Sequence, residues 1–192
     1  FVTREKPDAA LATKIAGTGD PHTSLDIAFI AEGYTRGEMD KFRNDVQRMA
    51  EYLFAEAQFD KYRDHINIWA VEAPSQESGT DVPGEGIYVN TALNASYYTF
   101  DVDRYLTTQD IRRVNDYAAA APHDQIIVLI NSPRYGGGGV YNYYSAVTAD
   151  HQLTPKVLTH EFGHGLVGLG DEYYSSEVAY EEIYPLDVEP WE

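Results

Sequence analysis

Two histidines four positions apart, with a glutamate directly after the first, constrain this chain more than any other feature of its sequence. They lie in THEFGHGLVGLGDEYY, residues 159–174. On an α-helix, residues i and i+4 lie on one face, one turn apart, so His160 and His164 can direct imidazole nitrogens at a single metal ion. Glu161 is rotated about a third of a turn from His160, too far to share the ion easily but near enough to take a proton from water there. This arrangement predicts a zinc site with a glutamate as general base.

The residues around the motif bear on the alternative, that these three side chains have this spacing by coincidence. We expect the motif on a partly buried helix that begins near Thr154, with Pro155 in its first turn. Two imidazoles beside a carboxylate are costly to bury there without a partner such as a metal ion. The chain has no cysteine, so a zinc site must use histidine and carboxylate ligands. The apolar residues that predict the burial are Val157, Leu158, Phe162 and Leu166.

A third protein ligand is expected, because catalytic zinc usually has three and keeps one position open for water. We expect Asp171 in this role, with Glu172 as the less favoured alternative. Glycine readily ends a helix by adopting a positive φ, and three glycines after His164 let the chain turn back toward the ion. The competing interpretation is that both acids lie on the surface beyond the helix end. The glycines are Gly165, Gly168 and Gly170.

The rest of the chain is predicted to form one mixed α/β (α+β) domain. Residues 1–24 are polar and rich in Gly, Pro and Thr, so we expect an arm or linker there and the domain over residues 25–192. Hydrophobic periodicity predicts an order of elements that suits a mixed sheet with helices packed against it. In chain order we expect a strand in 25–33, a helix from Arg36 to about Gln58, a strand from Ile66, a long ordered loop over 74–105, a helix in 106–121 capped by Thr107 or Thr108, a central strand in 124–131, a glycine-rich turn leading into an aromatic strand in 132–150, and the motif helix.

Charge and composition exclude several classes of function. The net charge of −17 disfavours nucleic acid, whose phosphates are held mainly by Lys and Arg, and also anionic membrane surfaces. No apolar run is long enough to span a membrane. The glycine run 136–139 lacks the spacing and the lysine of a phosphate-binding loop, so we reject nucleotide binding. The remaining histidines have no metal-like spacing and are expected to be ordinary surface or core residues: His22, His65, His123 and His151.

Several long motifs, in order along the chain, resemble the IgA-peptidase family of bacterial zinc metallopeptidases. They are DIAFIAEGYT, SGTDVPGEG, YGGGGVYNYYS, HEFGHGLVGLGDEYY and YPLDVEPWE, and the likeness runs from about residue 25 to residue 192. The resemblance implies a zincin fold, in which a twisted mixed sheet covers an active-site helix, with a catalytic Zn²⁺. It also implies a secreted, periplasmic or cell-surface endopeptidase that cleaves extracellular proteins. Immunoglobulin A is the known substrate of family members.

The chain departs from the longer zincin pattern at two points. That pattern has glycine seven residues and a ligand ten residues after the first histidine, but Val167 and Gly170 stand at these positions here. Gly168 and Asp171 each lie one residue further on. The sequence also ends before any methionine-containing turn of the kind that zincins place under the metal. We therefore expect a further part of the domain beyond Glu192.

The resemblance also suggests a role for the glycine run. In zincins the strand before the active-site helix is the sheet edge, and an extended substrate can pair with it. Glycines let another backbone approach closely, so we expect a substrate-binding edge, with a flexible turn as the alternative. Its residues are Gly137, Gly138, Gly139, Val140 and Tyr141. The tyrosines that could stabilise the oxyanion are Tyr141, Tyr143, Tyr173 and Tyr174, and the sequence does not choose among them.

Three functions are consistent with these sequence features. The leading hypothesis is a zinc endopeptidase that acts on extracellular proteins. The second is a non-catalytic protein- or glycan-binding module that keeps zinc for structure alone. The third is an intracellular zinc hydrolase of small amides. Glu161 favours an enzyme over the binding module, because a structural zinc site needs no base and is normally closed by four protein ligands. The sequence makes no prediction of oligomeric state.

Overall fold

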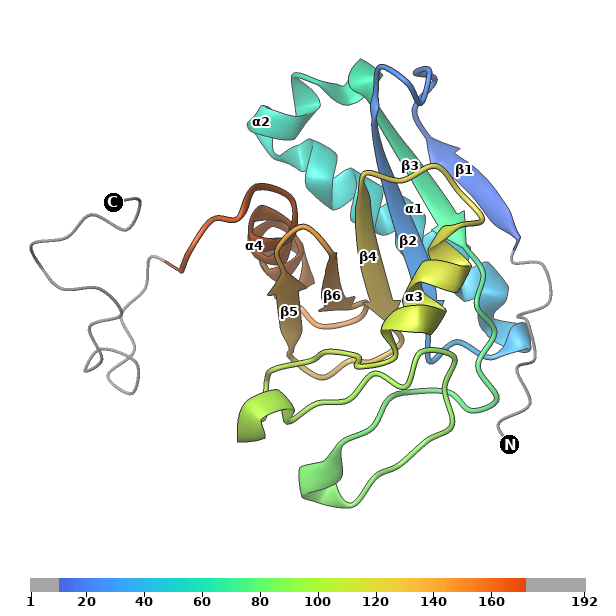
Figure 1. Cartoon of the computed structure of the whole chain (residues 1–192), viewed down its shortest axis with the longest axis vertical. Helices are drawn as coiled ribbons and strands as arrows, with labels where there is room; N and C mark the ends of the chain where they lie inside the picture. Colours follow the sequence, from blue (N-terminus) through green and yellow to red (C-terminus); the bar gives the residue numbers. More distant parts are fainter. Residues whose placement is uncertain (1–10, 172–192) are drawn as a thin grey trace, which may run out of the picture.

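The computed structural model describes residues 11–171, and these form a mixed α+β fold, as expected. A six-stranded sheet has the order β1-β3-β2-β4-β6-β5 (Figure 1). The four central strands are parallel, while β1 and β5 pair antiparallel at the two edges. The strands are β1 (Ala12–Ala16), β2 (Leu25–Glu32), β3 (Ile66–Val71), β4 (Gln125–Ile130), β5 (Gly137–Val140) and β6 (Tyr144–Thr148).

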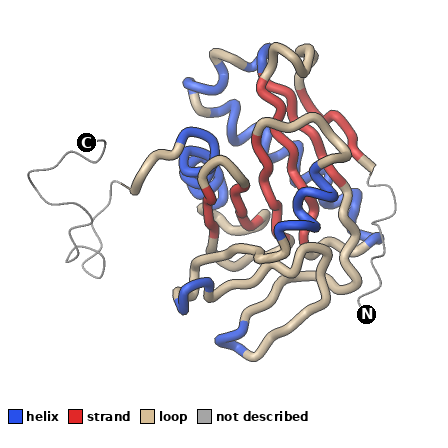
Figure 2. Tube along the Cα trace, viewed as in Figure 1, coloured by secondary structure: helices blue, strands red, loops and turns tan. Residues whose placement is uncertain are grey.

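Helices cover both faces of this sheet. They are α1 (Met39–Ala55), α2 (Ala57–Asp60), α3 (Ile111–Ala118) and α4 (Thr154–Val167). Helices α1 and α4 contact each other, and α4 packs on β5 and β6. Helix α3 lies on the opposite face from α1 (Figure 1). The long connections, drawn in tan in Figure 2, gather at the end of the sheet where the parallel strands finish. No helix in residues 11–171 is long and apolar enough to cross a membrane.

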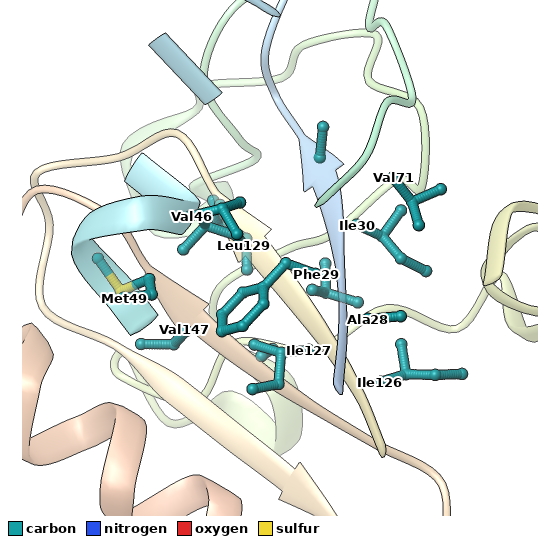
Figure 3. Packing of buried hydrophobic residues seen from close by; sticks show 14 of the residues in the cluster. Ala28, Phe29, Ile30, Val46, Met49, Val71, Ile126, Ile127, Leu129 and Val147 are labelled. Atoms are coloured by element: carbon teal, nitrogen blue, oxygen red, sulfur yellow. The ribbon is translucent and has the colours of Figure 1, made fainter. Parts of the chain in front are cut away.

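The central strands are buried on both faces, which explains their continuous apolar runs. Figure 3 shows Phe29 directed toward Val46 and Met49 of α1. Alternate residues point the other way, because successive side chains of a strand face opposite sides of the sheet. The residues on the α1 side in Figure 3 include Phe29, Ile127, Leu129 and Val147, and those on the other side include Ala28, Ile30, Val71 and Ile126.

Four local features differ from the sequence-based expectations. Strand β1 belongs to the segment expected to be an arm; it is a short, half-buried edge strand, which carries little periodic signal. Asp110, rather than Thr107 or Thr108, precedes α3, and the Thr108 hydroxyl oxygen accepts the N–H of Asp110 itself at 3.0 Å. Helix α1 ends at Ala55, and α2 follows separately. The glycines form edge strand β5 and not the turn that the order of elements predicted, which leaves the other expectation, a sheet edge at Gly137 to Tyr141.

A buried carboxylate, Glu32, ties the long connection between β3 and α3 to the sheet. It lies at the end of β2 and is fully buried. The carboxylate accepts a hydrogen bond from the Thr91 hydroxyl at 2.6 Å and from the backbone N–H groups of Leu93 and Ala95, each at 2.7 Å. Burial raises the pKa of Glu32, and these hydrogen bonds oppose the rise. Both carboxylate oxygens are therefore committed to donors of the connection.

We predict that Glu32→Gln lowers the free energy of unfolding by about 1–3 kcal/mol, because the amide NH₂ must then face another donor in a buried site. Urea unfolding followed by circular dichroism measures the change. Glu51→Gln on the exposed side of α1 is the matched control and should change the unfolding free energy by less than about 0.5 kcal/mol. Equal stabilities of the two variants would contradict this role for Glu32.

Candidate metal centre and active site

The second half of α4 positions the motif residues. The helix begins at Thr154, whose hydroxyl donates to the Thr148 carbonyl at 2.8 Å, and Pro155 lies in its first turn, as expected. Gly165 lets the helix approach the sheet closely, since a Cβ there would collide with the side chains of Ser145 and Gln125. Gly168, with a φ of 66°, ends the helix and turns the chain back. Asp171 follows and returns to the helix surface.

The structure brings together one donor atom from each of His160, His164 and Asp171. The two Nε2 atoms are 3.0 Å apart. Oδ1 of Asp171 lies 3.1 Å from Nε2 of His160 and 3.2 Å from Nε2 of His164. Tetrahedral zinc with bonds of about 2.0–2.1 Å spaces its ligand atoms about 3.3–3.4 Å apart. This nearly equilateral triangle therefore fits a zinc ion at the open apex above it. Glu172, the alternative third ligand, lies outside the described residues.

The tautomer of His164 supports the same conclusion. Its Nδ1 is hydrogen-bonded to the Leu169 carbonyl oxygen, which can only accept, so Nδ1 carries the proton. In the neutral ring Nε2 then carries the lone pair, and it lies 3.0 Å from Nε2 of His160. A backbone carbonyl that orients a histidine in this way is common around metal sites. The donor set of two imidazoles and one carboxylate is one that zinc accepts.

Glu161 is placed apart from these three donors, against strand β5. A Cβ built on Gly137 would lie 2.9 Å from Oε1 of Glu161, and one built on Gly139 would lie 3.1 Å from Oε2. No side chain fits between this strand and the carboxyl group. Burial raises the pKa of Glu161 to about 7, with Asp171 adding to the rise and His164 opposing it. The group therefore exchanges its proton near neutral pH, as a general base must.

The outer edge of β5 is only partly covered. The Gly137 N–H donates to the Arg104 carbonyl at 3.2 Å, and its carbonyl accepts from the Leu106 N–H at 3.1 Å. Because backbone groups alternate in direction along a strand, those of Gly139 point to the same outer side. In residues 11–171 neither the N–H nor the carbonyl of Gly139 has a hydrogen-bond partner beyond the sheet. Strand β5, rather than β6 directly before α4, is thus the sheet edge.

Two cavities meet at this edge and share Tyr105, Gly137, His160 and Glu161. One measures about 950 Å³ and extends along β5 toward Tyr141. The other measures about 490 Å³ and extends from Gly137 toward the start of α4. Exposed apolar side chains on the wall of the larger one include Phe100, Ile111 and Tyr141. Together the two cavities form a cleft that passes on both sides of the three-donor cluster.

Hydrogen bonds distinguish two of the four tyrosines that could stabilise the oxyanion. The Tyr143 hydroxyl donates to the Ile111 carbonyl at 3.0 Å, so its proton is committed. Tyr141 is exposed and lies beside Gly168. Tyr173 and Tyr174 lie outside the described residues.

The other histidines take no part in the cluster. Among residues 11–171, the only group of three or more side chains that could hold a metal ion is His160, His164 and Asp171. His123 is bonded through Nδ1 to the Ala121 carbonyl, and His151 accepts the Leu153 N–H. Both therefore have local structural partners.

Comparison with known proteins adds one finding. The profile of a family described as IgA Peptidase M64 matches residues 13–192, which is nearly the whole chain. None of the curated proteins compared with the chain matches it.

We predict that Asp171→Ala weakens zinc binding about 10- to 100-fold or more, because it removes a ligand, while Glu172→Ala weakens it less. Titration of both variants against a competing chelator measures the two affinities. If Asp171→Ala binds zinc like the parent and Glu172→Ala does not, the third ligand is Glu172.

We also predict that the metal-free protein loses stability as the pH rises from about 4.5 to about 7. The folded state raises the pKa of Glu161 from its ordinary 4.5 to about 7, so across this range it holds a proton that the unfolded chain releases. The contribution is complete below 4.5 and is lost as the pH rises through 7. Urea midpoints at several pH values, with chelator present, test this. Glu161→Gln should show the weaker pH dependence, and identical profiles would contradict the assignment.

Proposed function

The chain belongs to the IgA Peptidase M64 family, and from this premise we propose that it is a zinc-dependent endopeptidase whose active site lies between α4 and β5. The observation that carries the proposal is the triangle of donor atoms beside a buried carboxyl group. Family membership makes the chain a peptidase, and the donor triangle supports the metal, its ligands and the catalytic base.

We assign His160, His164 and Asp171 as the metal ligands. Zinc bound there would supply Lewis acidity, which lowers the pKa of water and polarises a carbonyl group. The Leu169 carbonyl holds His164 in the tautomer that presents Nε2 to the ion. Leu169 would therefore influence the metal site only through the orientation of His164.

Glu161 acts as the general base. Its carboxylate accepts a proton from the attacking water and then delivers it to the leaving amine nitrogen, so the proton balance closes on one side chain. In the metal-free protein burial raises the pKa of Glu161 to about 7, and a pKa near the working pH suits a group that both accepts and donates a proton. Contact with Gly137 and Gly139 excludes solvent from one side of the carboxyl group, which holds it in a fixed position beside the cleft.

Strand β5 aligns the substrate. An extended peptide can add to the sheet at Gly139, whose outward N–H and carbonyl groups supply backbone hydrogen bonds. Within the proposed substrate-binding edge Gly137–Tyr141, Gly139 offers these open backbone groups, because those of Gly137 already bond Arg104 and Leu106. Glu161 lies directly under it, so a peptide bound here presents its scissile bond to the base. Tyr141 is our candidate for stabilising the oxyanion among the described residues, because it lines the larger cavity and its hydroxyl forms no hydrogen bond within residues 11–171.

The non-catalytic alternative is less well supported. A structural zinc site is normally closed by four protein ligands, whereas the described residues offer three. Such a site also has no need for a buried carboxyl group beside it. We propose extracellular proteins as substrates and a secreted, periplasmic or cell-surface location, with immunoglobulin A as the first protein to assay. We further propose that the catalytic domain includes β1, since this strand completes one edge of the sheet.

We predict that Glu161→Gln keeps the fold and about one zinc ion per chain but loses about 10²- to 10⁴-fold in peptide hydrolysis, because it removes only the base. Zinc analysis and hydrolysis of labelled casein and of immunoglobulin A measure the two properties. Glu51→Gln again serves as the control. A Glu161→Gln protein that cleaves as fast as the parent would exclude Glu161 as the base.

A further inference from the structure

Lys156 lies on the same stripe of α4 as the two histidines. Lys156, His160 and His164 follow one another at intervals of four residues, so they share one face of the helix. One helical turn separates the first two by about 6 Å along the axis. Side chains on a helix tilt toward its N-terminus, so the ammonium group of Lys156 is directed away from the metal ligands, along the cleft.

This lysine lines the smaller of the two cavities, which leads away from Gly137 and Glu161 toward the start of α4. Arg104 also lines this cavity, with its guanidinium carbon 5.4 Å from the centre of the Tyr105 ring. The larger cavity has no Lys or Arg among its described lining residues. The described Lys and Arg side chains of the cleft therefore line only the smaller cavity.

A cationic wall is unusual on this chain, whose net charge is −17. Six of the twelve Lys and Arg side chains in residues 11–171 form ion pairs with neighbouring acids: Lys41, Arg43, Arg48, Arg63, Arg113 and Arg134. Lys156 is exposed and forms no ion pair with an acid in residues 11–171. Its charge thus faces the cavity and is available to a carboxylate that arrives with another molecule.

We infer that Lys156 forms a subsite for a substrate carboxylate, either an Asp or Glu side chain or the terminal carboxylate of a peptide. The inference rests on the proposed peptidase function. Strand β5 runs from Gly137 to Val140, so a peptide that pairs antiparallel with it runs toward the Gly137 end. The carboxylate then lies on the C-terminal side of the scissile bond. At about 3.3 Å per extended residue, it falls roughly two to three residues beyond that bond.

Peptide binding to the zinc-loaded Glu161→Gln protein tests this subsite without hydrolysis. The probes are short fluorescent peptides of one neutral sequence: an amidated parent, amidated versions with one Asn replaced by Asp or by Lys, and the parent with a free C-terminal carboxylate. Fluorescence anisotropy gives each Kd. In Lys156→Glu we expect the affinity for the carboxylate-bearing probe to fall about 5- to 20-fold relative to the neutral one, an effect that weakens with salt because the pair is exposed.

The matched control is Arg36→Glu, another exposed cation in a first helical turn that lines neither cavity. It should change every Kd by less than about twofold. Loss of affinity for the Asp probe assigns the subsite to an acidic side chain, and loss for the free-acid probe assigns it to the peptide terminus. Equal behaviour of Lys156→Glu and Arg36→Glu on all probes overturns the inference.

Hydrolysis by the parent protein separates this inference from the proposed function. Cleavage of the probes without any charge preference rejects the subsite and leaves the peptidase assignment intact. Charge-selective binding without hydrolysis under zinc-replete conditions supports the subsite and rejects the peptidase assignment. Zinc content equal to that of the parent shows that Lys156→Glu has kept the metal site, so a change in binding reports on the subsite itself.

Discussion

The close contact between β5 and α4 is the constraint on which the rest of the site depends. Only a strand of glycines can lie against the Glu161 side chain and the Cβ atom of His164. Any Cβ at Gly137 or Gly139 would come within about 3 Å of these atoms. This contact buries one side of the carboxyl group, which raises its pKa. It also places an open backbone edge directly beside the candidate base. One packing feature thus supports both the proposed chemistry and the proposed alignment of substrate.

Several parts of the fold hold that contact in place. On the helix side, Phe162 packs edge-on against Phe59 at 5.3 Å, while Gly165 lets α4 sit close to the sheet. On the strand side, residues 104–106 pair with Gly137. These residues belong to the long connection that Glu32 ties to the sheet through its hydrogen bonds. Glu32, although far in sequence from the three donor residues, therefore helps to support the wall of the cleft.

The sequence predicted the features that depend on local periodicity or on a short motif. The helix from Thr154, the apolar strand over 124–131 and the meeting of His160, His164 and Asp171 follow from residue spacing and a glycine-mediated turn. The missed features depend on tertiary partners. Strand β1 is too short to show a clear alternation, and a glycine run has no side chains from which to predict a strand. No residue near Glu32 in the sequence indicates that three donors of a distant loop bind it. A role for Lys156 is suggested only by the cavity that it lines.

X-ray absorption spectroscopy at the zinc edge tests the central claim most directly, because it reports the ligands of the bound ion. We predict two imidazole nitrogens and carboxylate oxygen at about 2.0–2.1 Å, with one further light ligand from solvent. Asp171→Ala should lose the carboxylate contribution, while Glu161→Gln should leave the spectrum unchanged. A first shell with fewer than two imidazoles, or one that changes in Glu161→Gln but not in Asp171→Ala, would contradict the proposed centre.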